Sequence, residues 1–231
     1  MAYEVVIMRD NVWRIEDGGV RSYLFAGGER ALLVDTGFGT GDLKSAAAGL
    51  TSLPLTLVNT HADGDHIGCN HQFETAYLYP AEFEYYAQSE RASENAKPLP
   101  LWESDIIDLG GGSFRFEVIH IPGHTWGSIA LLDRVNKILV SGDSVSEGAV
   151  FMFGPVRSLR AHIASMEKLL ARAGDIDAIY PAHGPTPIGA ASIEKLRGAG
   201  VKLLRGELPA LEPPFDIPAK MYMDAGHGFF Y

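Results

Sequence analysis

The sequence predicts an α/β protein in which two β-rich halves pack as a sandwich with outer helices, a four-layer αββα arrangement. Two observations support this prediction. Short apolar runs separated by turns rich in Gly, Asp and Asn recur in both halves of the chain. Each half also has a strand that ends in Asp, then a helix, then a strand that ends in His. These ends are Asp35 and His61 in the first half, and Asp143 and His183 in the second.

The first half reads as a β meander followed by alternating helices and strands. Its apolar runs predict strands over residues 5–8, 12–15, 23–26 and 31–34, then a helix near residues 41–50. The β-branched run 55–58 predicts a buried strand, and residues 76–79 another. A helix is expected over residues 81–90 behind Pro80, and the polar, proline-containing stretch 89–101 is expected to be a surface loop.

The second half repeats the pattern. Strands are expected over residues 106–109, 114–121, 128–132, 137–140 and 178–180, with an amphipathic helix over 158–173 that ends at Gly174 and a second near 188–197. We interpret residues 1–231 as one domain. The tail over residues 207–231 contains four prolines, so we expect it to be irregular.

Composition narrows the class of protein. The chain has 231 residues, of which 46% are hydrophobic, so it can bury a sizeable core. Its net charge of −10 disfavours binding to nucleic acid. No apolar run is long enough to span a membrane, and the first residues lack the pattern of a signal peptide. With the single cysteine Cys69, these features lead us to expect a cytoplasmic protein without a membrane partner.

The most informative stretch is residues 59–68, NTHADGDHIG, which follows the predicted strand 55–58. It brings two imidazoles, His61 and His66, and two carboxylates, Asp63 and Asp65, into six residues. Such groups converge where a divalent metal ion supplies compensating positive charge. Ligands at the carboxyl end of a strand also lie where open α/β sheets place their sites. The run therefore predicts a metal site.

Three further candidate ligands stand at strand ends beside Gly or Pro, where the backbone can turn sharply. They are His124 in PGHTWGS, Asp143 in SGD and His183 in PAHGP. A single histidine at a strand end is more often structural than a metal ligand. The four clusters in this order are much more specific than any one of them.

In this order of motifs the chain resembles the metallo-β-lactamase superfamily, whose signature is His-x-His-x-Asp-His followed by a Pro-Gly-His-Thr histidine, an Asp after Gly and a late His-Gly. The segment Asp35-Thr36-Gly37 is similar to the family's first-half turn. The resemblance implies a two-metal site at one edge of an αββα sandwich. It assigns the first metal to His61 and His124, the second to Asp65, His66 and His183, and the bridging position to Asp143.

The resemblance implies metal-assisted hydrolysis, in which a hydroxide between the metals attacks the substrate and Asp65 orients it or carries its proton. A small ester, thioester or lactone is the expected substrate. We expect the chain to be too short for the extra helical domain with which glyoxalase II relatives bind glutathione, and this disfavours that activity. A non-heme di-iron redox protein of the same fold and a non-catalytic ligand-binding member are the alternatives.

The departure from the signature is Asp63, which stands where the family has its second histidine. Three interpretations remain open: its carboxylate replaces the imidazole as a ligand, it does not reach and the first metal site is weak or empty, or the chain is a degenerate member without catalysis. A third carboxylate would lower the pKa of a bridging water less than two carboxylates do. Zinc is the first choice of metal, and the oxygen-rich ligand set favours iron or manganese as alternatives.

The segment after Asp143 and the aromatic tail are candidates for substrate binding. Residues 150–155 (VFMFGP) predict an apolar lining for the substrate, with a core-packing loop as the alternative. The tail MYMDAGHGFFY is too apolar to be free, so we expect it to cover the site or to form a homodimer contact. The candidate substrate-binding residues are Phe151, Met152, Phe153, Trp126, Arg157 and His227.

Overall fold

The computed structural model describes residues 3–231 and divides the chain into two compact units, Met1–Val118 and Ile119–Tyr231. Each unit has a hydrophobic core made of its own residues. Among the described residues, no helix combines the length and the apolar character that crossing a membrane requires.

The first unit is built on a seven-stranded sheet whose strands lie in chain order. Strands β1 to β4 form the expected antiparallel meander, and β4 to β7 run parallel. Parallel neighbours need crossover connections, and these carry the helices of the unit. The strands are β1 (Glu4–Arg9), β2 (Val12–Asp17), β3 (Val20–Ala26), β4 (Ala31–Val34), β5 (Leu55–Val58), β6 (Thr75–Leu78) and β7 (Lys97–Pro100).

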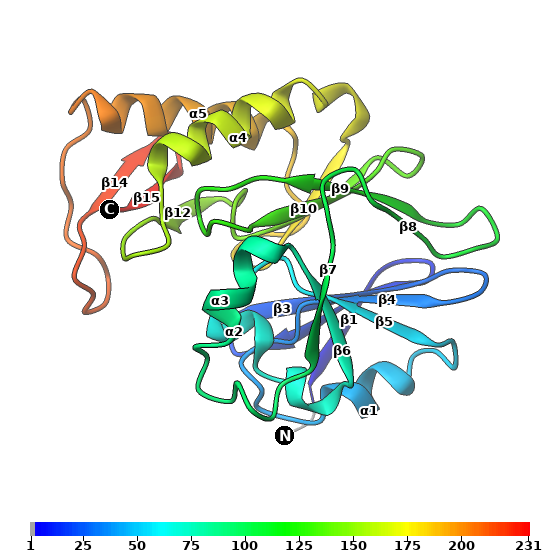
Figure 1. Ribbon diagram of the computed structural model, residues 1–231. Helices are drawn as coiled ribbons and strands as arrows, with labels where there is room; N and C mark the ends of the chain where they lie inside the picture. Colours follow the sequence, from blue (N-terminus) through cyan, green and yellow to red (C-terminus); the bar gives the residue numbers. More distant parts are fainter. Residues whose placement is uncertain (1–2) are drawn as a thin grey trace. The chain divides into compact units, whose positions relative to one another are not determined.

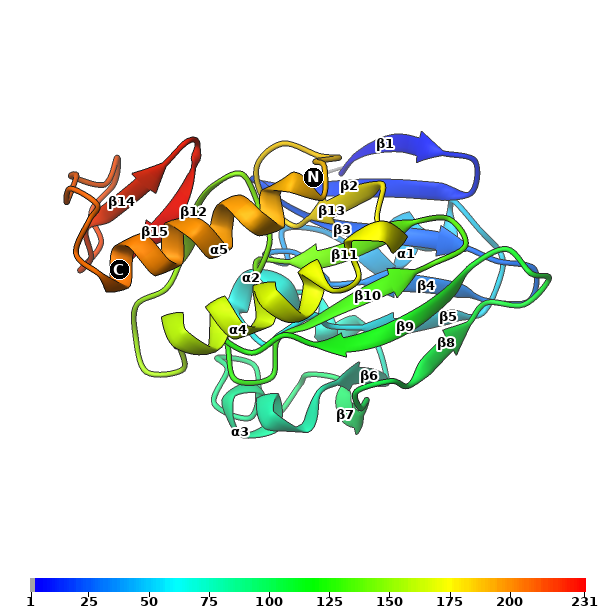
Figure 2. The ribbon, with the colours of Figure 1, turned by 90° about the horizontal axis from the view of Figure 1, so that it is seen from above.

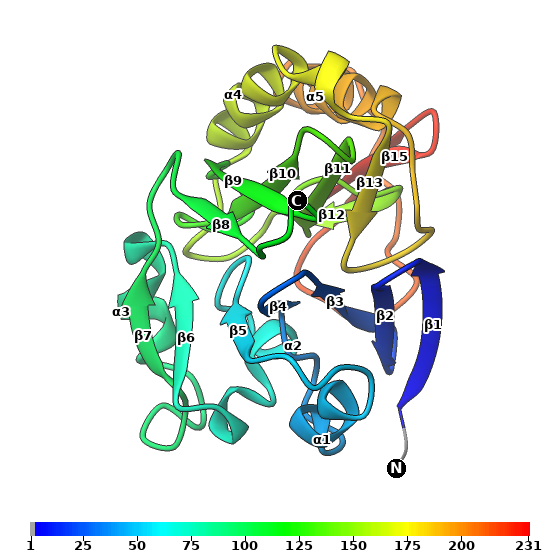
Figure 3. The same cartoon turned by 90° about the vertical axis from the view of Figure 1, so that its right-hand side faces the viewer.

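The helices of the first unit are short. Helix α1 follows Asp42, whose Oδ1 accepts a hydrogen bond from the Ser45 N–H at 2.9 Å and caps the helix. Its buried residues Leu43 and Ala47 join the core of the unit, and α1 lies against one face of the sheet (Figure 3). The helical segments are α1 (Leu43–Ala48), α2 (Gly64–Ile67), α3 (Phe83–Tyr86) and the 3₁₀ turns η1 (Asn70–Gln72) and η2 (Pro80–Glu82).

Two expectations for the first unit were wrong in detail. The stretch 89–101 is not all loop, because β7 forms within it at the edge of the sheet. Prolines are tolerated there because an edge strand has free positions for residues without an N–H. The helix expected over residues 81–90 ends at Tyr86, because the chain then enters short turns such as the one closed by Glu94 N–H and the Arg91 carbonyl.

The second unit carries most of a five-stranded sheet of order β13-β11-β10-β9-β8, and the division between the units falls within β9. Helices α4 and α5 lie side by side over this sheet (Figures 1 and 2). The Ser158 hydroxyl accepts a hydrogen bond from Ala161 N–H and caps α4. The elements are β8 (Ile106–Asp108), β9 (Arg115–His120), β10 (Ile129–Asp133), β11 (Ile138–Gly142), β13 (Ala178–Pro181), α4 (Leu159–Leu170), η3 (Ala173–Asp175) and α5 (Ala191–Leu204).

The tail, expected to be irregular, instead completes a three-stranded sheet of order β12-β15-β14. Strand β12 (Gly148–Phe151) pairs in parallel with β15 (His227–Phe230), which pairs antiparallel with β14 (Met221–Asp224). The hairpin turn is Ala225-Gly226, and both residues have positive φ, 48° and 83°. A two-residue turn of this kind matches the twist of antiparallel strands. The sequence signal was therefore this turn between two apolar runs, and the nearby prolines obscured it.

We predict opposite effects for two glycines of α5. A Cβ at Gly200 would lie 2.8 Å from Cγ1 of Ile163 on α4, whereas a Cβ at Gly198 meets nothing within 4 Å. Gly200→Ala should lower the free energy of unfolding by about 1–2 kcal/mol through overpacking. Gly198→Ala should raise it by about 0.5–1 kcal/mol through helix propensity. Urea denaturation measures both, and equal changes in the two variants would contradict close packing of α4 on α5 at Gly200.

Candidate functional site

The first group of candidate ligands follows β5, and the buried carboxylate of Asp35 holds it in place. Strands β4 and β5 run parallel, so the residues that follow them meet at one edge of the sheet. Asp35 follows β4 with φ of 61°, a conformation that Asp tolerates better than most residues. Its Oδ1 accepts from Thr60 N–H at 2.7 Å, and its Oδ2 accepts from the Thr60 hydroxyl at 2.7 Å and from His66 Nδ1 at 2.9 Å.

These hydrogen bonds fix the tautomers of two histidines. A carboxylate only accepts hydrogen bonds, so His66 carries its proton on Nδ1 and presents the lone pair of Nε2. The single proton of the Thr60 hydroxyl is committed to Asp35, so its oxygen accepts from His61 Nδ1 at 3.0 Å. His61 therefore also presents Nε2. A partner on the second ring nitrogen is the usual arrangement for a histidine that binds metal.

Each of these two imidazoles faces one carboxylate of the same unit. His61 Nε2 lies 3.4 Å from Asp63 Oδ2, and His66 Nε2 lies 3.7 Å from Asp65 Oδ2. Both distances exceed an ordinary hydrogen bond. They are close to the roughly 3.3–3.5 Å that separates two ligand atoms on one tetrahedral zinc ion. The donor set thus fits a divalent metal, with His61 and Asp63 as one ligand pair and Asp65 and His66 as another.

Two residues near α3 hold this segment from the other side. Tyr85 Oη donates to Asp63 Oδ1 at 3.0 Å, and buried Glu82 accepts from Ala62 N–H at 2.8 Å. Tyr85 also lines a cavity of about 390 Å³ beside Gly64. Neither contact is predictable from the sequence, because a lone Tyr or Glu some twenty residues from the motif has no pattern of its own.

The second unit brings together the three remaining candidates, which follow β9, β11 and β13. The two oxygens of Asp143 face different imidazoles: Oδ2 lies 3.6 Å from His124 Nε2, and Oδ1 lies 3.4 Å from His183 Nε2. His124 Nδ1 donates to the carbonyl oxygen of Phe151 at 2.8 Å, which again leaves Nε2 for a metal. A carboxylate between two imidazoles is the arrangement that a bridging ligand requires.

Helix α4 supports two of these ligand loops through His162. Gly123 precedes His124 with φ of 145°, and a Cβ there would lie 2.4 Å from Cα of His162. The buried His162 ring donates from Nε2 to the carbonyl oxygen of Ser144, next to Asp143, at 2.8 Å. Burial lowers the pKa of His162 to about 4, and nearby His124 contributes to the lowering.

The residues expected to bind substrate differ in exposure. Trp126 is 46% exposed and Phe151 36%, while Phe153 and Arg157 are half-buried. Met152 is buried in the core of the second unit, and His227 is buried with Nδ1 donating to the Ala225 carbonyl. Phe151 and Trp126 therefore offer the exposed apolar surface of this group.

Comparison with known proteins gives a consistent result. Residues 15–205 match the model of the Metallo-beta-lactamase superfamily. The acyl-coenzyme A thioesterase MBLAC2 of Gallus gallus is 30% identical over 209 residues, which cover 74% of this chain and 75% of that protein. The hydroxyacylglutathione hydrolase GloC of Haemophilus influenzae is 29% identical over 185 residues, covering 70% and 84%.

Solved structures confirm the predicted αββα fold class. A metallo-beta-lactamase from Pontibacter korlensis has a TM-score of 0.71 at 18% identity and covers 86% of this chain and 99% of that one. TTHA1623 in a di-iron-bound form has a TM-score of 0.60 at 28% identity and covers 76% and 92%. The family match ends at residue 205, so β14 and β15 lie beyond it.

The lowered pKa of His162 predicts a pH dependence of stability. Between about pH 4 and 6.5, unfolding takes up a proton at this residue. The contribution of His162 to the free energy of unfolding is therefore fully present above pH 6.5 and decreases as the pH drops toward 4. The slope for one group is at most about 1.4 kcal/mol per pH unit. His162→Gln retains an N–H donor and does not titrate. Urea denaturation of wild type and variant from pH 4.5 to 7.5 should give a difference that varies with pH, and a constant difference would contradict the prediction.

Proposed function

This chain belongs to the metallo-beta-lactamase superfamily and is a metal-dependent hydrolase, and we propose that it hydrolyses thioesters at a two-metal centre. The observation that carries the proposal is the pairing, inside each unit, of imidazole Nε2 atoms with carboxylate oxygens at 3.4–3.7 Å. The thioester class is supported by the two relatives, one an acyl-coenzyme A thioesterase and the other a hydroxyacylglutathione hydrolase. Esters and lactones are the neighbouring classes of substrate.

The ligand pairs suggest how two metal ions would be held. We assign His61, Asp63 and His124 to the first ion, Asp65, His66 and His183 to the second, and Asp143 to both. The pairing within each unit supports this division, because His61 faces Asp63, His66 faces Asp65, and each oxygen of Asp143 faces one imidazole. In this assignment Asp63 takes the place of an imidazole and binds through Oδ2.

Two bound divalent ions would supply the charge that makes water acidic enough to act as a nucleophile near neutral pH and that polarises the substrate carbonyl. Asp65 is partly exposed, with 21% of its side chain accessible, so water can reach it. We assign to its carboxylate the orientation of that water and the receipt of its proton. Asp35 and the Phe151 carbonyl keep three imidazoles in the orientation that this chemistry needs.

Zinc remains the first choice of metal, since imidazole and carboxylate ligands with tetrahedral spacing suit it. The additional carboxylate of Asp63 favours a second candidate function, a di-iron redox protein, because oxygen-rich ligand sets shift preference toward iron or manganese. The 28% identity to TTHA1623, solved in a di-iron-bound form, supports this alternative. In either case the partner is a small molecule, and the buried free thiol of Cys69 agrees with a cytoplasmic location.

Metal content and thioester hydrolysis test the proposal together. Protein purified without added metal should contain two ions per chain and hydrolyse an acyl thioester, and a chelator should abolish the activity. Asp63→Ala should retain one ion and bind the other at least about 100-fold more weakly, because loss of a ligand exceeds loss of an outer contact. Asp10→Ala, which removes an exposed carboxylate far along the sequence from the motif, is the control.

The other outcomes separate the candidates. Two ions retained in Asp63→Ala would contradict the role of Asp63 as a ligand. Two iron ions with a visible absorption band and no thioester hydrolysis would favour the redox function. Tight binding of a thioester without turnover would favour a non-catalytic member of the family.

A further inference from the structure

An aromatic cluster lies on the second unit and consists of Phe151, Phe153, Phe215 and Phe230. The rings of Phe151 and Phe215 are stacked, with centroids 6.0 Å apart and an angle of 8°. Both rings contact Phe230, at 4.8 and 5.2 Å, and Phe153 lies 5.7 Å from Phe151. The four rings therefore form one continuous cluster.

The cluster combines a buried anchor with exposed faces. Phe230 is 6% exposed, whereas Phe151 is 36% and Phe215 47% exposed. Leaving large aromatic faces in water costs free energy, and such surfaces on folded proteins commonly mark binding sites. Because the rings are already ordered, a ligand that packs on them loses little further conformational entropy.

Phe151 connects this cluster directly to a metal ligand. Its carbonyl oxygen accepts the hydrogen bond from His124 Nδ1 at 2.8 Å, so the exposed ring belongs to the residue that orients the imidazole. The aromatic cluster and this candidate ligand therefore share one strand, β12, as their support.

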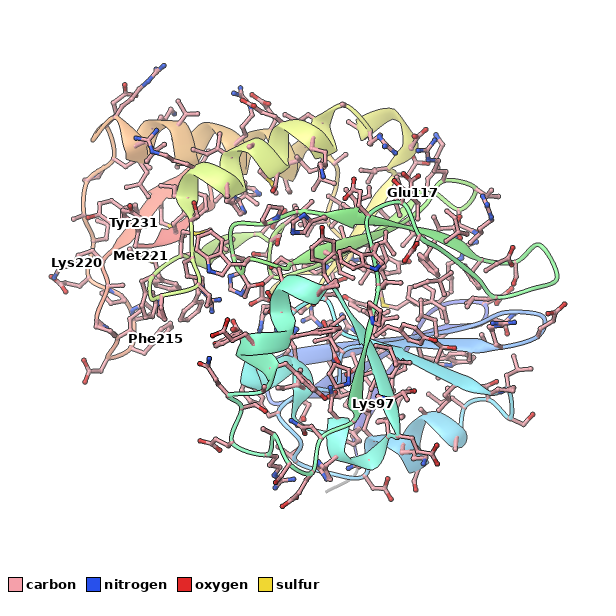
Figure 4. All side chains as sticks on the ribbon, viewed as in Figure 1. Lys97, Glu117, Phe215, Lys220, Met221 and Tyr231 are labelled. Atoms are coloured by element: carbon pink, nitrogen blue, oxygen red, sulfur yellow. The ribbon has the colours of Figure 1, made fainter. Side chains whose placement is uncertain are left out.

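The tail of the chain builds half of the cluster. Phe215 and Phe230 lie beyond residue 205, where the family match ends. Strand β15 places Phe230 beside Phe151 in the parallel register with β12, and Met152 N–H donates to the Phe230 carbonyl at 2.8 Å. Phe215 lies on the loop that precedes β14 (Figure 4). Half of the cluster thus lies beyond the residues that the family model matches.

We propose that the aromatic cluster is the acyl subsite of this hydrolase and that it takes an aliphatic or aromatic acyl group of medium length. This inference rests on the proposed thioester hydrolysis. The ring faces are apolar, so they favour contact with the acyl part of a thioester. The loop around Phe215 carries Glu212 and Asp216 against one lysine, Lys220, and this balance disfavours an anionic lipid surface as the occupant.

The test compares acetyl and octanoyl thioesters of the same thiol. The holoenzyme should prefer the octanoyl substrate. Phe215→Ala should lower kcat/KM for the octanoyl thioester about tenfold, while the value for the acetyl thioester should change less than about twofold. The matched control is Leu211→Ala, which removes an apolar side chain of similar exposure, 41%, from the same tail but outside the cluster. It should leave both values unchanged.

One further measurement, calorimetric binding of an apolar alcohol, separates this inference from the proposed function. If the wild type hydrolyses neither thioester, the proposed function fails, and calorimetric binding of 1-octanol to the holoenzyme tests the cluster alone. Weaker binding by Phe215→Ala supports a subsite for apolar chains, and equal binding overturns it. Equal chain-length preference in wild type and variant also overturns the inference, as does a dimer that Phe215→Ala abolishes without a change in that preference.

An independent contact carries a second inference, which concerns Asp63. Tyr85 Oη donates to its Oδ1 at 3.0 Å, and its Oδ2 faces His61 Nε2 at 3.4 Å. A free carboxylate can bind a metal through both oxygens, whereas an imidazole offers one lone pair. A hydrogen bond that occupies Oδ1 leaves a single oxygen for the metal and draws negative charge away from it.

We infer that Tyr85 is a positioning residue that makes Asp63 act as a one-atom ligand in place of an imidazole. Tyr85 belongs to α3, which begins behind the 3₁₀ turn of Pro80–Glu82, and Glu82 of that turn holds the Ala62 N–H at 2.8 Å. The two contacts fix the backbone and the side chain of the same segment. This inference rests on the assignment of Asp63 as a metal ligand.

A double-mutant cycle tests the role of Tyr85. Tyr85→Phe should weaken the binding of the first zinc ion about tenfold when residue 63 is Asp, measured by competition with a chromophoric chelator. In the Asp63→His background the same substitution should change the affinity less than about twofold, because an imidazole lacks the oxygen that Tyr85 holds. The control Tyr86→Phe removes the neighbouring hydroxyl, which donates to the Ala96 carbonyl at 2.9 Å, and should leave zinc affinity unchanged.

Equal losses in the two backgrounds would show that Tyr85 acts only through general stability, and this would overturn the inference. No loss in either background would overturn it as well. If Asp63→Ala itself leaves the metal content unchanged, the assignment of Asp63 fails first, and the two failures are thereby distinguished.

Discussion

The carboxylate of Asp35 is the constraint on which the first group of ligands depends. It is buried and accepts three hydrogen bonds, from the Thr60 amide, the Thr60 hydroxyl and His66 Nδ1. Because a carboxylate cannot donate, its presence decides the proton positions on Thr60, His66 and, through Thr60, His61. Both imidazoles therefore present Nε2. A neutral side chain at residue 35 would leave these proton positions open, so the candidate ligands depend on a residue outside the proposed ligand set.

The second unit achieves the same orientation by packing and backbone carbonyls. The Phe151 carbonyl orients His124, and the Ser144 carbonyl is held by His162 from α4. This requires α4 to approach Gly123 so closely that no side chain fits there. His162 also contacts the ring of Phe229, a residue of the hydrophobic core. The ligand loops of this unit are thus fixed to its core, whereas those of the first unit are fixed by a buried charge.

The sequence predicted the parts of the site that have a local pattern. The candidate ligands His61 and His124 follow strands and have recognisable neighbours, Asp65 belongs to the same run as His61, and the strands themselves are short apolar runs. It did not predict Tyr85 or the Phe151 carbonyl, because a contact across 22 or 27 residues leaves no spacing to recognise and a backbone acceptor has no side-chain signature. Strands β7, β12, β14 and β15 were missed for a related reason. Their pairing is decided by distant partners, while their prolines and glycines suggest loops.

The charge of Asp63 connects the ligand set to the substrate class. Two divalent ions carry four positive charges, and Asp63, Asp65 and Asp143 together carry three negative charges, one more than a set with histidine at position 63. Less net positive charge remains to acidify a nucleophilic water, so its pKa is lowered less. A smaller population of hydroxide suffices when the leaving group is good, and a thiol, with a pKa of about 8.5, leaves far more readily than an amine or an alcohol. If Asp63 binds metal as proposed, its carboxylate would therefore favour thioester cleavage over the opening of an amide ring.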